Sequence, residues 1–167
     1  RGQHEFHDIP LLAIDDLVER LVPYLQRDGV IGSTPSAEDM NLVRAVVPLI
    51  SERLETLGQA SAMVGFLFTD DIAIDAGDAE KIMGDQADDV LREAEAALAG
   101  LDEWTTEAIE RALRVTLIEE RGLKPKVAFG PVRLAITGRR VSPPLFESME
   151  LLGADRSLSR IRSLHAS

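Results

Sequence analysis

The 167-residue chain has no cysteine, and it has only one tryptophan and one tyrosine. The missing thiols exclude a disulfide-stabilised scaffold and a thiolate zinc site. No apolar run approaches the roughly 18 residues that a membrane span needs. A Walker-type glycine loop, a G-x-G-x-x-G turn and an H-E-x-x-H pair are also absent. We therefore predict no catalytic residue, no metal site and no association with a membrane.

Charge is distributed unevenly along the chain, whose net charge is −11. Residues 1–120 hold 9 basic and 26 acidic side chains, whereas residues 121–167 hold 9 basic and 3 acidic ones. A cationic stretch free of acids is typical of a surface that holds a phosphate backbone. Here it comprises Arg121, Lys124, Lys126, Arg133, Arg139 and Arg140. Three further cations, Arg156, Arg160 and Arg162, lie on a helix end that suits positive charge. For them, pairing with the chain's own acidic helices is as good an interpretation as contact with a phosphate backbone.

Apolar residues recur every three to four positions, which predicts helices almost throughout. The first follows residues 14–25 and stops near Gly29, and the second begins after an N-cap at Ser36 and is kinked at Pro48. A later helix is capped by Thr105 with Trp104 stapled on Ile109. Residues 127–136 fit either a strand or a buried helix, and we predict a helix.

The acid-rich segment TDDIAIDAGD, residues 69–78, interrupts the helical pattern. It lacks the ligand spacing of a calcium loop, so we interpret it as a solvated linker. The predicted fold class is all-α, with two small consecutive helical domains over residues 11–73 and 74–167.

A helical corner is predicted at residues 130–153. Gly138 ends the apolar segment that precedes it, because a residue without Cβ can turn the chain there. Ser142 is expected as the N-cap and Pro143 as the first residue of the next helix. Val141 and Phe146 are expected to pack as a hydrophobic staple. An exposed helix N-terminus beside several arginines would suit a phosphate or a base carbonyl, although an ordinary corner with solvated arginines is the simpler interpretation.

Several phrases of the sequence resemble, in the same order, the C-terminal region of bacterial glutamyl-tRNA synthetases. They are VVPLISERLETL, LDEWTTEAIERAL, GLKPKVAFGPVR, VRLAITG, SPPLFESMELLG and ADRSLSRIRSL. The resemblance implies a helical anticodon-binding cage and covers residues 11–164. It does not reach residues 1–10, for which a native origin and an origin in an expression vector both stay open.

The resemblance also implies roles for individual residues. Arg53 occupies the place of the arginine that reads the third anticodon base; its alternative is a surface ion pair. The first two bases would be read from the corner, by Arg133, Ser142, Pro143, Leu145 and Phe146. Leu145 and Phe146 would form an apolar platform, although the core is the alternative for both. Pro144 stands where family members often have glycine, which stiffens the corner.

The parent enzyme implied by the resemblance joins glutamate to its tRNA with ATP and Mg²⁺ in the cytoplasm. The His-x-Gly-His stretch and the lysine-rich loop of its catalytic half are absent here, so this region should be inactive alone and should need no cofactor. We expect a monomer, linked to an N-terminal catalytic domain, that binds glutamate tRNA; acceptance of glutamine tRNA stays open.

One alternative of another class is an acidic helical protein-interaction module that does not bind RNA. The histidines add no third function, since His4, His7 and His165 lie at the two ends of the chain, where a metal site is not expected.

Overall fold

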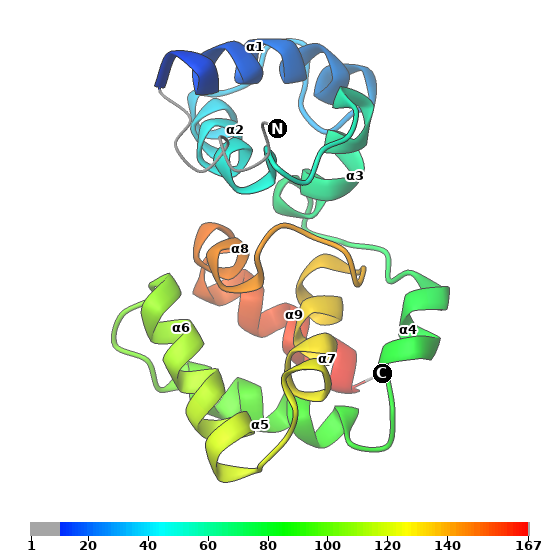
Figure 1. Ribbon diagram of the computed structural model, residues 1–167, viewed down its shortest axis with the longest axis vertical. Coiled ribbons are helices and arrows are strands. Elements are labelled where there is room, and N and C mark those ends of the chain that lie inside the picture. The colour runs from blue at the N-terminus through cyan, green and yellow to red at the C-terminus, as the bar shows by residue number, and fades with distance from the viewer. Residues whose placement is uncertain (1–10, 167) are drawn as a thin grey trace. The chain divides into compact units, whose positions relative to one another are not determined.

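The structure, a computed structural model, describes residues 11–166, and all regular elements within that range are helical (Figure 1). The predicted all-α class is therefore confirmed. The described chain divides into two compact units between Thr69 and Asp70. The predicted domains meet a few residues later, within the same linker. His4 and His7 lie outside the described residues.

The first unit is built from two longer helices and three short ones. They are α1 (Leu11–Arg27), α2 (Ala37–Ile50), η2 (Leu57–Gln59), α3 (Ala60–Val64) and η3 (Gly65–Phe68). Helix α1 packs against α2 and α3. The interior contains buried apolar side chains from α1, α2 and α3, among them Val18, Leu21, Leu25, Val43, Val47, Ile50 and Val64.

Local signals mark the end of α1 and the start of α2 as predicted. Gly29 has φ +76° two residues after α1 ends. The Ser36 side chain accepts a hydrogen bond from the backbone N–H of Asp39 at 3.0 Å and so caps α2. Helix α2 contains Pro48 and ends at Ile50. The chain then turns, and this turn carries Arg53.

The second unit contains α4 (Ala76–Ile82), α5 (Ala87–Ala99), α6 (Thr106–Leu113), the π-helix η4 (Arg114–Glu120), α7 (Pro125–Thr137), α8 (Leu145–Leu152) and α9 (Ala154–Ala166). Helix α5 packs on α7 and α9, and α6 packs on α8 (Figure 1). Ala87 and Ala94 are buried on α5. Their small side chains let the neighbouring helices approach α5 closely.

Helix α7 is the central element of this core. Residues 127–136, for which a strand was the alternative, form a helix, and most of the residues of α7 are buried. Thr105 caps α6 as predicted, accepting from the N–H of Ala108 at 3.1 Å. The Trp104 indole N–H donates to the Met149 carbonyl at 2.8 Å, a bond that ties the start of α6 to α8.

The corner after α7 differs from its prediction. Helix α8 begins at Leu145 with Pro144 as its N-cap, not at Pro143 with Ser142 as the cap. The reason is the second proline: a residue that precedes proline is disfavoured in the helical region, so Pro143 cannot open the helix. The predicted staple is also wrong, since Val141 is 59% exposed and the ring of Phe146 packs perpendicular to the ring of Phe129, with the ring centroids 5.3 Å apart.

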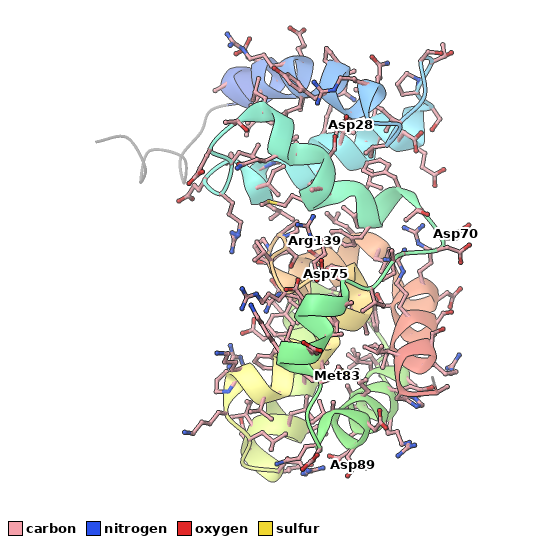
Figure 2. The ribbon with its side chains drawn as sticks, turned by 90° about the vertical axis from the view of Figure 1, so that its right-hand side faces the viewer. Asp28, Asp70, Asp75, Met83, Asp89 and Arg139 are labelled. Carbon is pink, nitrogen blue, oxygen red and sulfur yellow. The ribbon has the colours of Figure 1, made fainter. Side chains whose placement is uncertain are left out.

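Gly138 ends α7 in the left-handed conformation, with φ +81°, as predicted. A Cβ at this position would collide with the carbonyl oxygen of Ala73. The approach is close because the N–H of Asp75 donates to the Gly138 carbonyl at 2.8 Å. Figure 2 shows Arg139 beside Asp75. The linker therefore lies along the turn after α7, and glycine is required there.

None of the helices in the described residues 11–166 combines the length and the hydropathy that a membrane span requires.

Candidate nucleic-acid interface

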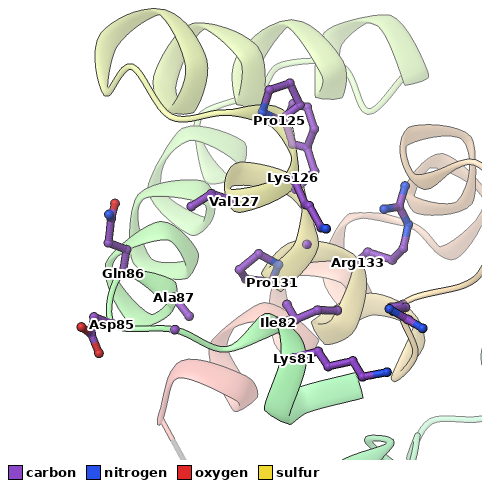
Figure 3. A pocket seen from close by; sticks show the side chains of 14 residues that line it. Lys81, Ile82, Asp85, Gln86, Ala87, Pro125, Lys126, Val127, Pro131 and Arg133 are labelled. Atoms are coloured by element: carbon purple, nitrogen blue, oxygen red, sulfur yellow. The ribbon is translucent and has the colours of Figure 1, made fainter. Parts of the chain in front are cut away.

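A cationic pocket lies between α4, the start of α5 and α7 (Figure 3). Its volume is about 710 Å³, within the range of pockets that hold small ligands. Four cations and one carboxylate line it: Lys81, Lys126, Arg133, Arg140 and Asp85. Like charges repel one another, so a cluster of this kind is favourable only when an anion or counter-ions lie nearby. The pocket is therefore suited to a phosphate.

The lysines are the less constrained of these cations. Lys81 lies in the last turn of α4 and Lys126 in the first turn of α7, and both are exposed. Among the described residues, neither ammonium group has a hydrogen-bond or ion-pair partner. Arg140 differs, because its Nε lies 3.5 Å from Asp78 Oδ1 and its backbone N–H donates to Asp78 Oδ2 at 2.9 Å.

Arg133 reaches the same pocket from the middle of α7 (Figure 3). Its neighbours in sequence, Val132 and Leu134, are buried, whereas Arg133 is half-buried. Its carbonyl accepts from the hydroxyl of Thr137 at 2.9 Å. The helix thus fixes the backbone of Arg133 and leaves part of the side chain at the pocket.

The other corner residues, which were predicted to contact anticodon bases, are buried or half-buried and expose little surface for such contacts. Ser142 and Pro143 are buried, and the Ser142 hydroxyl donates to the Pro143 carbonyl at 2.7 Å. Leu145 is only 3% exposed. Phe146 is half-buried, and its packing on Phe129 agrees with the core alternative. Base contacts by these four residues stay a prediction.

The remaining cations of the predicted backbone surface are spread around the second unit. Arg121 forms an ion pair with Glu93 on α5, and its guanidinium donates to Gln86 at 3.4 Å. Lys124 is the exposed N-cap residue of α7, and Arg139 is exposed directly after Gly138. Of the six cations in the acid-free stretch, the structure brings Lys126, Arg133 and Arg140 into one pocket.

The three cations near the C-terminal end mostly follow the intramolecular alternative. Arg156 lies 3.5 Å from Asp70, and Arg162 lies 2.8 Å from Glu95. Arg160 is buried and donates to the Ile136 carbonyl at 2.6 Å. Arg156 lies in the first turn of α9, whereas the helix dipole favours cations in the last turn, so the dipole does not stabilise its charge.

Arg53 belongs to the first unit and is exposed in the turn after α2. Its backbone N–H donates to the Ile50 carbonyl at 2.8 Å. No ion pair of its guanidinium with any residue in the described range is present, so the surface-pair alternative has no support. The anticodon role of Arg53 stays a prediction.

The sequence did not single out Lys81, which lies in an acidic stretch and is the only cation between Arg53 and Arg92. Helix α4 was not predicted from the sequence, so no signal in the sequence marked Lys81, which lies in the last turn of that helix, a common position for lysine. The contact that brings it to the pocket is tertiary: α4 packs on α7, where a Cβ at Gly130 would lie 3.2 Å from Ile82 Cγ2.

The described residues form two helical units, and the second unit carries a cationic pocket. Residues 16–164 match a family model described as an anticodon binding domain. The chain belongs to this anticodon-binding domain family.

Curated relatives point to one class of enzyme. The chain is 53% identical over 153 residues to a glutamate–tRNA ligase of Saccharopolyspora erythraea, a match that covers 91% of the chain and 30% of the relative. It is 49% identical over 155 residues to a glutamate–tRNA ligase of Nocardioides sp., covering 92% and 32%. The chain thus spans about a third of the length of the curated relatives that it matches.

Solved structures show the same fold. A glutamate tRNA ligase from Elizabethkingia meningosepticum, crystallised in complex with its amino acid, matches with a TM-score of 0.73 at 18% identity, over 99% of this chain and 31% of that one. A glutamate-tRNA synthetase from Elizabethkingia anophelis matches with a TM-score of 0.72 at 19% identity, over 99% and 30%.

Proposed function

We propose that this chain binds the anticodon of glutamate tRNA as one region of a glutamate–tRNA ligase. The match of residues 16–164 to the anticodon-binding family is the observation that carries the proposal. The cationic pocket on α7 supports it, because phosphate contacts supply much of the affinity of nucleic-acid-binding surfaces.

In this proposal, Arg53 reads the third anticodon base. An arginine suits that task because its guanidinium is always charged and can donate two parallel hydrogen bonds to a base edge or stack on its face. The bases of an anticodon lie in a loop, where they can be unstacked and offered to such a group. Arg133 and the corner that follows α7 would contact the first two bases.

The catalytic step belongs to the parent enzyme in this proposal. That enzyme would use ATP and Mg²⁺ to join glutamate to the tRNA 3′ end in the cytoplasm, at a site outside this chain. Correct anticodon contacts would help to hold the acceptor end in that site, so discrimination would appear partly as rate. We further propose that the enzyme is monomeric, and we keep glutamine tRNA as a second substrate to be tested.

A filter-binding titration of the chain with glutamate tRNA tests the proposal. Binding should be measurable at low salt and should weaken steeply at moderate salt, because each phosphate contact releases counter-ions. Lack of binding at low salt would contradict the proposal.

One observation favours a different function, an acidic helical module that binds another protein. Several cations of the second unit are engaged by the chain's own carboxylates, as in the pairs of Arg121 with Glu93 and of Arg162 with Glu95. Neutralised cations attract phosphates less strongly. An RNA-free chain that captures a protein partner would be the result in favour of this alternative.

A further inference from the structure

We propose that Asp78 is a specificity-determining residue for tRNA binding, and that it acts by positioning Arg140. Its carboxylate holds both the backbone and the guanidinium of Arg140, so that this cation meets a phosphate from a fixed direction. The inference rests on the proposed function and deepens it, because it gives a carboxylate, rather than a further cation, a part in selecting the tRNA.

Asp78 contacts Arg140 through both of its carboxylate oxygens. Oδ2 accepts a hydrogen bond from the Arg140 backbone N–H at 2.9 Å, and Oδ1 lies 3.5 Å from the Arg140 Nε. The two residues are 62 positions apart in the sequence, and the packing of α4 on α7 brings them together. A carboxylate that holds the main chain and the side chain of one residue restricts the directions in which that side chain can point.

Asp78 is itself held in place by a closed ring of hydrogen bonds. The Asp75 backbone N–H donates to the Gly138 carbonyl at 2.8 Å, and Asp75 Oδ1 accepts from the Asp78 backbone N–H at 2.9 Å. The bond from the Arg140 N–H to Asp78 closes the ring. Figure 2 shows Asp75 next to Arg139, the residue before Arg140. The ring fixes the carboxylate relative to the turn after α7, because its bonds support one another.

The exposure of the two side chains suits a restraint that leaves the cation accessible. The Asp78 side chain is 21% exposed, whereas that of Arg140 is 52% exposed. A guanidinium has five N–H donors, and one carboxylate oxygen beside Nε does not engage them all. A phosphate can therefore reach Arg140 while the ion pair is intact.

A restrained cation discriminates between ligands better than a mobile one. A long mobile side chain can follow a phosphate in many arrangements of the RNA, so it stabilises correct and incorrect complexes alike. A cation held in one direction adds affinity only to a complex that places a phosphate there. The Asp78 charge also offsets that of Arg140 and so weakens its attraction for more distant phosphates. We therefore expect Asp78 to disfavour tRNAs whose anticodon does not fit.

A purely structural role is the competing explanation, in which Asp78 only joins α4 to the turn after α7. The bond from Asp75 to Gly138 and the packing of α4 on α7 already join these segments. A join between backbones also has no need of the contact between Oδ1 and the guanidinium of Arg140. These observations favour the positioning role.

Asp78→Asn separates the two roles, because asparagine keeps an oxygen that can accept from the Arg140 N–H but removes the negative charge. Fluorescence anisotropy at low salt gives the affinities of the chain for glutamate tRNA and for the same tRNA with an unrelated anticodon. Asp78→Asn should bind the unrelated tRNA about 3- to 5-fold more tightly, the effect of releasing one surface ion pair, relative to glutamate tRNA. Asp88→Asn is the matched control: it removes the same charge from an exposed position on α5 and should leave the ratio of the two affinities unchanged.

A double-mutant cycle shows whether Asp78 acts through Arg140. In the Arg140→Gln background, Asp78→Asn should no longer change the ratio of the two affinities, because the cation that Asp78 positions is gone. Thermal melting followed by circular dichroism checks that each variant is folded. The same change of ratio with and without Arg140, or an equal loss of affinity for both tRNAs with a lower melting temperature, would overturn the positioning role.

The outcomes also separate this inference from the proposed function. Anticodon-dependent binding by the wild type, with a ratio of affinities that Asp78→Asn leaves unchanged, would overturn the role of Asp78 and leave the proposed function standing. Equal affinity of the wild type for the two tRNAs, or no binding to either at low salt, would overturn both.

Discussion

The buried Arg160, which is only 7% exposed, donates a hydrogen bond from Nη1 to the carbonyl oxygen of Ile136 at 2.6 Å. Burial and the nearby charge of Arg156 lower the pKa of Arg160 to about 10, while Asp70 acts in the opposite direction. The side chain therefore stays charged at neutral pH. It places a cation at the C-terminal end of α7, where the helix dipole favours one, and links α9 to the turn that follows α7.

Arg160→Met should lower the free energy of unfolding by about 2 kcal/mol, because the buried Ile136 carbonyl would lose a charged donor. Urea denaturation followed by circular dichroism measures the loss. Arg162→Met on the same helix is the control: Arg162 is exposed and paired with Glu95, and such surface pairs are worth less than about 1 kcal/mol. Equal losses in the two variants would contradict the assignment.

Gly138→Ala should be more damaging than Gly122→Ala. Both positions have positive φ, +81° and +72°, so each alanine is strained by about 1 kcal/mol. Only at Gly138 would the new Cβ collide with the backbone of Ala73; nothing lies within 4 Å of the corresponding Cβ at Gly122. The expected difference in thermal melting is several degrees. Similar melting temperatures would show that the linker does not lie along this turn in solution.

Stability should fall at acidic pH, in part through Glu150. Hydrogen bonds from the Thr106 hydroxyl and backbone N–H lower the pKa of Glu150 below its usual 4.5. A carboxyl whose pKa is lower in the folded state stabilises the fold above the unfolded pKa, and this contribution is lost as pH falls through the folded pKa. Glu150→Gln should therefore reduce the dependence of the unfolding free energy on pH below about 4.5. An unchanged dependence would contradict the contact.

Glu95 should act in the same direction. Hydrogen bonds from His165 and Arg162 lower its pKa, with His165 the larger cause. Glu95→Gln is expected to reduce the dependence of the unfolding free energy on pH at acidic pH. Combining it with Glu150→Gln should reduce this dependence further, since the two sites share no partner. Chemical denaturation at a series of pH values between about 3 and 6 checks the sum. A double variant no flatter than either single one would show that the groups do not act independently.

Arg53→Gln in the intact ligase should change preference at the third anticodon base. Loss of a guanidinium that grips a base edge should reduce discrimination there about 10-fold, measured as kcat/KM on tRNA variants at that base. Arg44→Gln removes an exposed cation of the same unit and should leave the preference unchanged. Unchanged preference in Arg53→Gln would remove Arg53 from the reading role.

The sequence predicted much of the fold because its signals there are local. Ser36, Thr105 and Gly138 each act within a few residues of their own positions, and each marks a helix end as predicted. The prediction of the corner was wrong because two local preferences compete there. Ser142 followed by a proline resembles an N-cap, but the second proline disfavours the helical conformation at Pro143.

The candidate site was only partly predictable for a different reason. Lys126, Arg133 and Arg140 lie in a cationic stretch, and two of them share one helix. Lys81 reaches the pocket only through the packing of α4 on α7, and no pattern in the acidic segment around it indicates that contact. Side-chain burial was only partly predictable: the sequence left Leu145 open between an apolar platform and the core, and this residue is 3% exposed in the structure.

The most direct test of the account compares the affinity of this chain for glutamate tRNA with its affinity for the same tRNA carrying an unrelated anticodon, at one low salt concentration. Anticodon reading predicts at least about 10-fold tighter binding to the glutamate anticodon, the discrimination expected from one or two base contacts. Equal affinity for the two tRNAs, or no binding to either, would contradict it.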